Sequence, residues 1–188
     1  MKPRTWTAAA LAALFAMSGM AQDFDLINHP GYINLDDIDI PENARNVTEV
    51  CIGPEILQMV NMFSDEDISK EEFGGFLNIT VKTFDVDVDI AESIREKMME
   101  IDKKLKREKW SPLVKSRSGD EFTNVSIKYS KDRKKSLGLF IMSLDPNHEA
   151  SFVNIVGNID FNQLKDMDIG IKGSALDSLR HISGKQDD

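Results

Sequence analysis

The longest apolar pattern in the chain runs from Leu137 to Asp160 and consists of two runs separated by a short polar segment. Between Leu137 and Leu144 apolar residues occupy both odd and even positions, which is typical of a strand covered on both faces. The four residues 145–148, Asp-Pro-Asn-His, favour a turn, and apolar residues resume at Phe152. The pattern predicts a central β-hairpin against which the rest of the chain packs.

Two segments have apolar residues at helical spacing. After a strand predicted at Val47–Ile52, Pro54 suits the first position of a short amphipathic helix. A longer helix is predicted to begin at Asp89, which forms a capping-box-like pair with Glu92. The apolar stripe of this longer helix comprises Ile90, Ile94, Met98, Ile101 and Leu105.

The remaining segments read as strands. Leu77, Ile79 and Val81 alternate with polar residues, but after Thr83 the apolar phase moves to Phe84, which predicts either a bulge or a strand that leaves the sheet. Beyond the longer helix we predict a strand at Leu113–Lys115, a turn at residues 116–119, and a strand at Thr123–Tyr129. In that last strand one face is expected to meet water, and its residues are Asn124, Ser126 and Lys128.

The order of these elements predicts an α+β fold. We expect two layers, in the order β-α-β-α-β-β-β-β-α, with a mixed, mostly antiparallel sheet and two main helices on one face. The final helix of this series is predicted to open at Asp160. The predicted organisation is a signal peptide at residues 1–21, an acidic leader at 22–45, a single α+β domain at 46–168 and a weakly ordered tail at 169–188.

The first residues have the pattern of an export signal. Lys2 and Arg4 precede an apolar run that is too short to span a membrane, and small residues follow near Ala21, where we predict cleavage. The next residue is Gln22, so the cysteine that a lipid anchor requires is missing. We therefore predict an exported protein, periplasmic or secreted and soluble after cleavage, with no transmembrane segment.

Net charge and cysteine content exclude further classes of partner and structure. The formal net charge is −9, and such an acidic surface repels nucleic acid, so we expect no nucleic-acid partner. The single cysteine, Cys51, rules out an internal disulfide. Because Cys51 lies in a strand-like run, we expect it to be a buried small hydrophobic residue.

Within the range from Pro30 to Met167, six segments form an ordered series: PGYINLDDI, VTEVCIGPEILQMV, ITVKTFDVD, WSPLVKSRSGDEFTNVSIKY, GLFIMSLD and ASFVNIVGNID. In order and spacing the series resembles the bacterial family called domain of unknown function 4252. The resemblance implies a small exported or envelope protein of a Gram-negative bacterium. Many members carry a lipobox, which this chain lacks, and the family brings no established activity or catalytic residue.

Few residues form patterns that carry chemistry. Asp85, Asp87, Asp89 and Glu96 match four ligand positions of a calcium loop, but Ile90 stands where that loop needs glycine. Asp145, His148 and Glu149 could form an acid–base group, although a solvated turn is the expected role. A basic patch could contact lipid A phosphates, lipopolysaccharide or an acidic partner; alternatively it keeps strands from pairing edge to edge. Its residues are Lys128, Lys131, Arg133, Lys134 and Lys135.

The three histidines, His29, His148 and His181, are far apart in the sequence and fit no zinc motif. We therefore predict no catalytic, cofactor-binding or metal-ligating residue and no cofactor. The leading hypothesis is a non-enzymatic exported module that binds a protein or an envelope component. The alternatives are a small-ligand or calcium-binding module and, less favoured, a hydrolase. The oligomeric state stays open.

Overall fold

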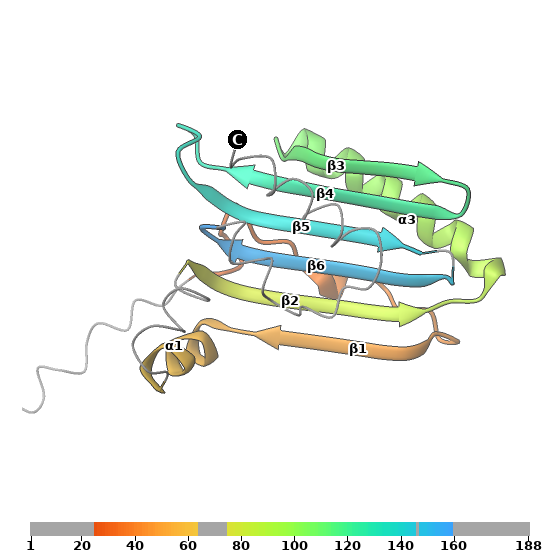
Figure 1. The fold of residues 1–188 in the computed structure, drawn as a ribbon, viewed down its shortest axis with the longest axis horizontal. Coiled ribbons are helices and arrows are strands. Elements are labelled where there is room, and N and C mark those ends of the chain that lie inside the picture. Colours follow the sequence, from red (N-terminus) through yellow and green to blue (C-terminus); the bar gives the residue numbers. More distant parts are fainter. Residues whose placement is uncertain (1–24, 64–74, 146, 160–188) are drawn as a thin grey trace, which may run out of the picture.

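The computed structural model describes residues 25–63, 75–145 and 147–159, which contain a six-stranded sheet (Figure 1). The strands are β1 (Arg45–Ile52), β2 (Phe76–Asp85), β3 (Ser111–Ser118), β4 (Glu121–Tyr129), β5 (Ser136–Leu144) and β6 (Glu149–Gly157). Their order across the sheet is β1-β2-β6-β5-β4-β3. The hairpin of β5 and β6 occupies the two middle positions and is almost wholly buried, which confirms the predicted centre of the fold.

The fold is α+β, as predicted, but every pair of neighbouring strands is antiparallel rather than mixed. Parallel neighbours need a crossover connection. The long helix α3 (Val88–Arg107) connects β2 to β3, and these two strands are not neighbours in the sheet. The connection therefore creates no parallel pair.

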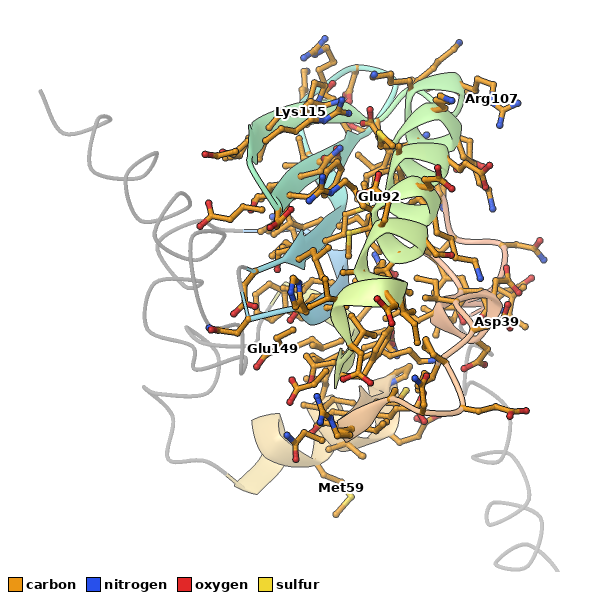
Figure 2. The ribbon with its side chains drawn as sticks, turned by 90° about the vertical axis from the view of Figure 1, so that its right-hand side faces the viewer. Asp39, Met59, Glu92, Arg107, Lys115 and Glu149 are labelled. Carbon is orange, nitrogen blue, oxygen red and sulfur yellow. The ribbon has the colours of Figure 1, made fainter. Side chains whose placement is uncertain are left out.

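Helix α3 lies along one face of the sheet (Figure 2). Its buried residues Ala91, Ile94, Met98 and Leu105 belong to one apolar cluster with side chains from β2, β4, β5 and β6, among them Phe84, Phe122, Phe140 and Phe152. The short helix η1 (Leu35–Asp37) adds Leu35 to this cluster. The N-cap of α3 is Asp87, not Asp89 as predicted, because the carbonyl of Asp87 already accepts hydrogen bonds from two amides of the first turn.

A second apolar cluster lies on the opposite face of the sheet. It contains Ile79, Val81, Val125, Ile127, Leu139, Ile141, Val153 and Ile155, together with Leu57 of helix α1 (Pro54–Phe63). The prediction that two main helices share one face is not confirmed, because the buried residues of α1 and α3 belong to different clusters.

Burial on two faces also explains the phase change in β2. The irregularity predicted after Thr83 is not in β2, which stays in the sheet and pairs with β6 in regular register from Asn78 to Asp85. The register shift at this position lies in the neighbouring strand, between Arg45 and Thr48 of β1. Apolar residues change parity along β2 because each face has its own cluster. Lys82 replaces an apolar residue on the α3 face, and its Nζ binds Glu49 Oε1 at 2.9 Å and the carbonyl of Ile38 at 3.3 Å.

One buried asparagine attaches the segment before β1 to the sheet. Asn154 of β6 is 0% exposed. Its Nδ2 donates to the carbonyls of Gly31 and Leu139 at 3.0 and 3.2 Å, and its Oδ1 accepts from the amide of Ile33 at 2.8 Å. Gly31 lies so close to β5 that a Cβ there would be 1.9 Å from the carbonyl oxygen of Leu137, so this contact requires glycine.

The expectation that one face of the Thr123–Tyr129 strand meets water is wrong. Asn124 and Ser126 of β4 are 1% and 2% exposed because α3 packs above them. Strand β3 also extends to Ser118, and the turn that follows contains Gly119 at φ +55°. The predicted signal peptide, the helix at Asp160 and the C-terminal tail lie outside the described residues.

Candidate functional site

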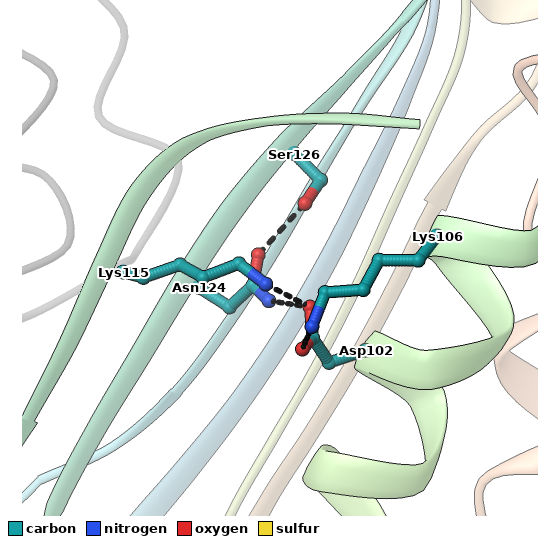
Figure 3. A network of polar contacts seen from close by, with 5 residues as sticks. All are labelled: Asp102, Lys106, Lys115, Asn124 and Ser126. Carbon is teal, nitrogen blue, oxygen red and sulfur yellow. Dashed lines mark hydrogen bonds and ion pairs between the residues drawn. The ribbon is translucent and has the colours of Figure 1, made fainter. Parts of the chain in front are cut away.

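A buried carboxylate lies between α3 and the β3–β4 hairpin (Figure 3). Asp102 is 3% exposed, and its Oδ1 accepts from Lys115 Nζ at 2.5 Å and from Asn124 Nδ2 at 2.6 Å. Its Oδ2 pairs with Lys106 Nζ at 2.8 Å. Behind them Ser126 Oγ donates to Asn124 Oδ1 at 2.7 Å. The five side chains form one connected network across three elements.

The network keeps Asp102 charged. Burial by itself raises the pKa of this carboxyl, but hydrogen bonds from Lys106, Lys115 and Asn124 outweigh it, so the pKa of Asp102 lies below its ordinary value. The same contact with Asp102 raises the pKa of Lys106. A general acid or base works best with a pKa near the operating pH. The two shifts move the pKa values of Asp102 and Lys106 further from neutral pH. The network therefore attaches helix α3 to the β3–β4 hairpin.

None of the five residues of this network was predicted as a site from the sequence. Asp102 falls on the apolar stripe of α3, four residues after Met98 and three before Leu105. A charged residue on a core stripe, opposite a strand whose alternate positions are Asn124 and Ser126, was the available signal. Recognising it required knowing that α3 packs on that face of β4.

The residues that resemble a calcium loop are separated by the start of α3. Asp85 ends β2 and accepts from Asn46 Nδ2 at 2.6 Å, while Asp87 pairs with Arg45 at 2.9 Å. Asp89 and Glu96 lie on α3, where both are exposed. Within the described ranges no group of three or more His, Cys, Asp or Glu side chains is arranged to hold a metal ion.

Asp145 and His148 lie in the turn of the central hairpin, and Glu149 begins β6. Asp145 Oδ1 accepts from the backbone amides of Asn147 and Glu149, both at 2.9 Å. His148 adopts φ +64° and donates its amide to the carbonyl of Asp145. The carboxylate that was the candidate acid–base partner therefore stabilises the turn.

The two edges of the sheet differ in how they are protected. Edge strands commonly carry proline or charged residues that prevent pairing with other strands. Strand β3 has Pro112, Lys115 and Arg117. Strand β1 has a register shift near its start, with Asn46 at φ +50°, but from residue 48 to residue 52 it pairs regularly with β2. This second part of β1 contains no proline and no basic residue, and its one charged residue, Glu49, is paired with Lys82.

Apolar side chains are exposed on this part of β1 and on the helix that follows it in the chain. Every residue of β1 before Ile52 is exposed, including Val50 at 39%. In the adjacent helix α1, Ile56 and Met59 are 50% and 56% exposed, and Met59 lies at the β1 end of the molecule (Figure 2). We call Thr48–Ile52 with Ile56 and Met59 the β1 edge.

Cys51 belongs to the β1 edge and is exposed, so the expectation that it is buried is wrong. The reason is its position: the α3 face of the sheet is covered over the inner strands, whereas β1 is the outermost strand. Its Sγ lies 3.8 Å from Asn78 Nδ2 and 4.0 Å from Thr80 Oγ1.

Comparison with family models gives one match. Residues 42–167 match the model described as Domain of unknown function (DUF4252). This range is more than half of the chain. The chain belongs to the DUF4252 family. Neither the search of curated proteins nor the search of solved structures found a match.

The DUF4252 match covers all six strands and α3, so it includes both the Asp102 network and the β1 edge. The described segment before residue 42, with η1, precedes the matched range. In the part of this DUF4252 chain that the structure describes, no helix is long and apolar enough to cross a membrane.

Proposed function

We propose that this chain is an exported, non-enzymatic binding module that adds an extended segment of a partner protein to strand β1. The observation that carries the proposal is the β1 edge: a regular outer strand, exposed along most of its length, beside exposed apolar side chains. An outer strand has unpaired backbone donors and acceptors, and an added strand satisfies them.

The contrast between the two edges supports this choice of surface. At β3, Pro112 and the exposed basic residue Arg117 oppose pairing. At the β1 edge, Val50 and the exposed residues of α1 offer apolar contacts for alternate side chains of an added peptide. The paired Asp102 network supports the non-enzymatic part of the proposal, because its carboxylate already has three partners.

The single cysteine provides a direct test. A maleimide photo-crosslinker attached to Cys51 reports on whatever lies along β1. We expect a discrete crosslinked product in envelope extract whose crosslinked residues form one continuous extended peptide. The control is Cys51→Ser with Ser118→Cys, which moves the probe to the exposed end of β3.

A variant separates strand addition from accidental contact. Val50→Lys places a protecting charge on the β1 edge and should abolish the Cys51 product, whereas Ser116→Lys on β3 should leave it unchanged. Equal products from the probe on β1 and the control probe on β3, or a product that persists in Val50→Lys, would exclude the proposal.

A further inference from the structure

Positive charge is concentrated in one segment of this acidic chain. Residues 103–135 contain 12 of the 23 Lys and Arg residues and only four acids. This segment has a net charge of +8 in a chain of net charge −9, so the remaining residues carry −17. Such segregation creates a local positive field that the net charge conceals.

The end of α3 and the β4–β5 turn together carry much of this charge. Residues 104–109 and 131–135 contain eight exposed cations, of which Lys106 pairs with Asp102. The other seven are Lys104, Arg107, Lys109, Lys131, Arg133, Lys134 and Lys135. We call them the basic corner. Lys128 joins the segments, because its Nζ contacts the carbonyl of Glu108 and lies 5.9 Å from the centre of the Trp110 ring.

Both segments have a fixed backbone. Helix α3 ends in a Schellman motif, in which the amide of Trp110 donates to Leu105 at 2.9 Å and that of Lys109 donates to Lys106 at 3.1 Å. In the turn, Asp132 accepts from Ser130 Oγ at 2.6 Å. These contacts fix the backbone that carries the cations.

The positive charge of the basic corner is not neutralised by acidic side chains of the protein. Among the described residues, none of its seven side chains takes part in a salt bridge. Arg133 lies 5.3 Å from the ring centre of Tyr129. The acids within these two segments are Glu108 and Asp132, and hydrogen bonds from Ser130 and the Lys134 amide lower the pKa of Asp132. Asp132 therefore stays ionised and leaves a clear excess of positive charge.

We propose that the basic corner binds the anionic headgroups of a phospholipid membrane surface. All seven cations are exposed, so they suit many phosphates spread over a surface better than one small anion held in a pocket. Screening limits electrostatic contact to about 8 Å at physiological salt. A planar membrane contacts only the basic corner. A long polyanion that wraps around the protein also approaches the acidic rest of its surface, which repels it.

The contact is peripheral and reversible by salt. Trp110 is buried and Tyr129 is half-buried, so neither ring is available to insert into the bilayer. The β1 edge and the β3–β4 side lie at opposite ends of the sheet, where Figure 2 shows Met59 and Arg107. A membrane at the corner therefore leaves the β1 edge accessible.

The test is co-sedimentation of the full chain with vesicles at low and high salt. We expect binding to vesicles containing phosphatidylglycerol, release at high salt, and no binding to phosphatidylcholine alone. Lys131→Gln, Lys134→Gln and Lys135→Gln together should weaken binding by about tenfold or more. The matched control, Arg45→Gln, Lys97→Gln and Arg117→Gln, removes the same net charge elsewhere and should bind like the parent. Thermal unfolding confirms that both variants fold.

Four results would overturn the proposal. They are no binding to phosphatidylglycerol vesicles, equal binding to phosphatidylcholine, equal loss in both triple variants, and tighter binding to single-stranded DNA than to vesicles. Competition with inorganic phosphate distinguishes binding to a membrane surface from binding of free phosphate. Millimolar phosphate should release the protein no more than sodium chloride of equal ionic strength, and specific release would also exclude the proposal.

Discussion

The Asp102 network gives the sharpest prediction about stability. Asp102→Ala removes an acceptor that serves Lys115, Lys106 and Asn124. The Asn124 amide is buried and has no route to water, so leaving it unpaired costs about 1–3 kcal/mol. Lys115 and Lys106 are partly exposed and can turn to solvent, and exposed ion pairs contribute little. We expect Asp102→Ala to lower the free energy of unfolding by about 2–3 kcal/mol at neutral pH.

The conservative variant separates the charge from the hydrogen bond. Asp102→Asn keeps a carbonyl oxygen that can still accept from Asn124, so its loss should be smaller, about 1 kcal/mol. Glu100→Gln is the matched control, since Glu100 is exposed on the same helix. It removes the same charge without removing a buried partner and should stay within about 0.5 kcal/mol of the parent.

The effect of pH has a defined sign. The pKa of Asp102 in the folded chain lies below its ordinary value, which is near 3.9 in an unfolded chain. The contribution of the carboxylate is therefore complete above about pH 4 and is lost as the pH falls through the lower pKa of the folded chain. The difference between the parent and Asp102→Asn should be constant from neutral pH down to about pH 5 and should shrink below about pH 4.

Urea unfolding measures these differences. Trp110 belongs to the cluster beneath α3 and is 4% exposed, so its fluorescence reports loss of this packing, with circular dichroism as a second probe. The reasoning is refuted if Asp102→Ala unfolds like the parent at neutral pH. It is also refuted if the gap between Asp102→Asn and the parent widens as the pH falls.

Three further predictions follow from single contacts. Asn154→Ala leaves buried backbone groups unpaired and should cost about 2–4 kcal/mol, with faster proteolysis at residues 25–44 than in the parent. Gly31→Ala forces a Cβ against the Leu137 carbonyl and should lower stability by about 1–3 kcal/mol, measured by thermal unfolding, whereas Gly119→Ala, in open space but at positive φ, should cost only about 1 kcal/mol. The Cys51 thiol should react completely with a thiol reagent in the native protein, and reaction only after addition of denaturant would contradict its exposure.

Local patterns were enough to predict the centre of the fold. Apolar residues at both parities in Leu137–Leu144 identified a strand buried on two faces, because only such a strand needs apolar side chains on both sides. The stripe from Ile94 to Leu105 identified α3 because a helix on a sheet buries one face. These elements depend on neighbours within a few residues, and that information is present in the sequence.

Strand order decided the features that the patterns could not predict. Cys51 lies in a strand-like run, yet it is exposed because β1 is the outermost strand. Asn124 and Ser126 have the alternation of a wet face, yet α3 covers them and supplies Asp102 as their partner. Periodicity tells which side chains share a face, but whether that face meets water depends on packing between segments distant in the sequence. Both the β1 edge and the Asp102 network depend on such packing.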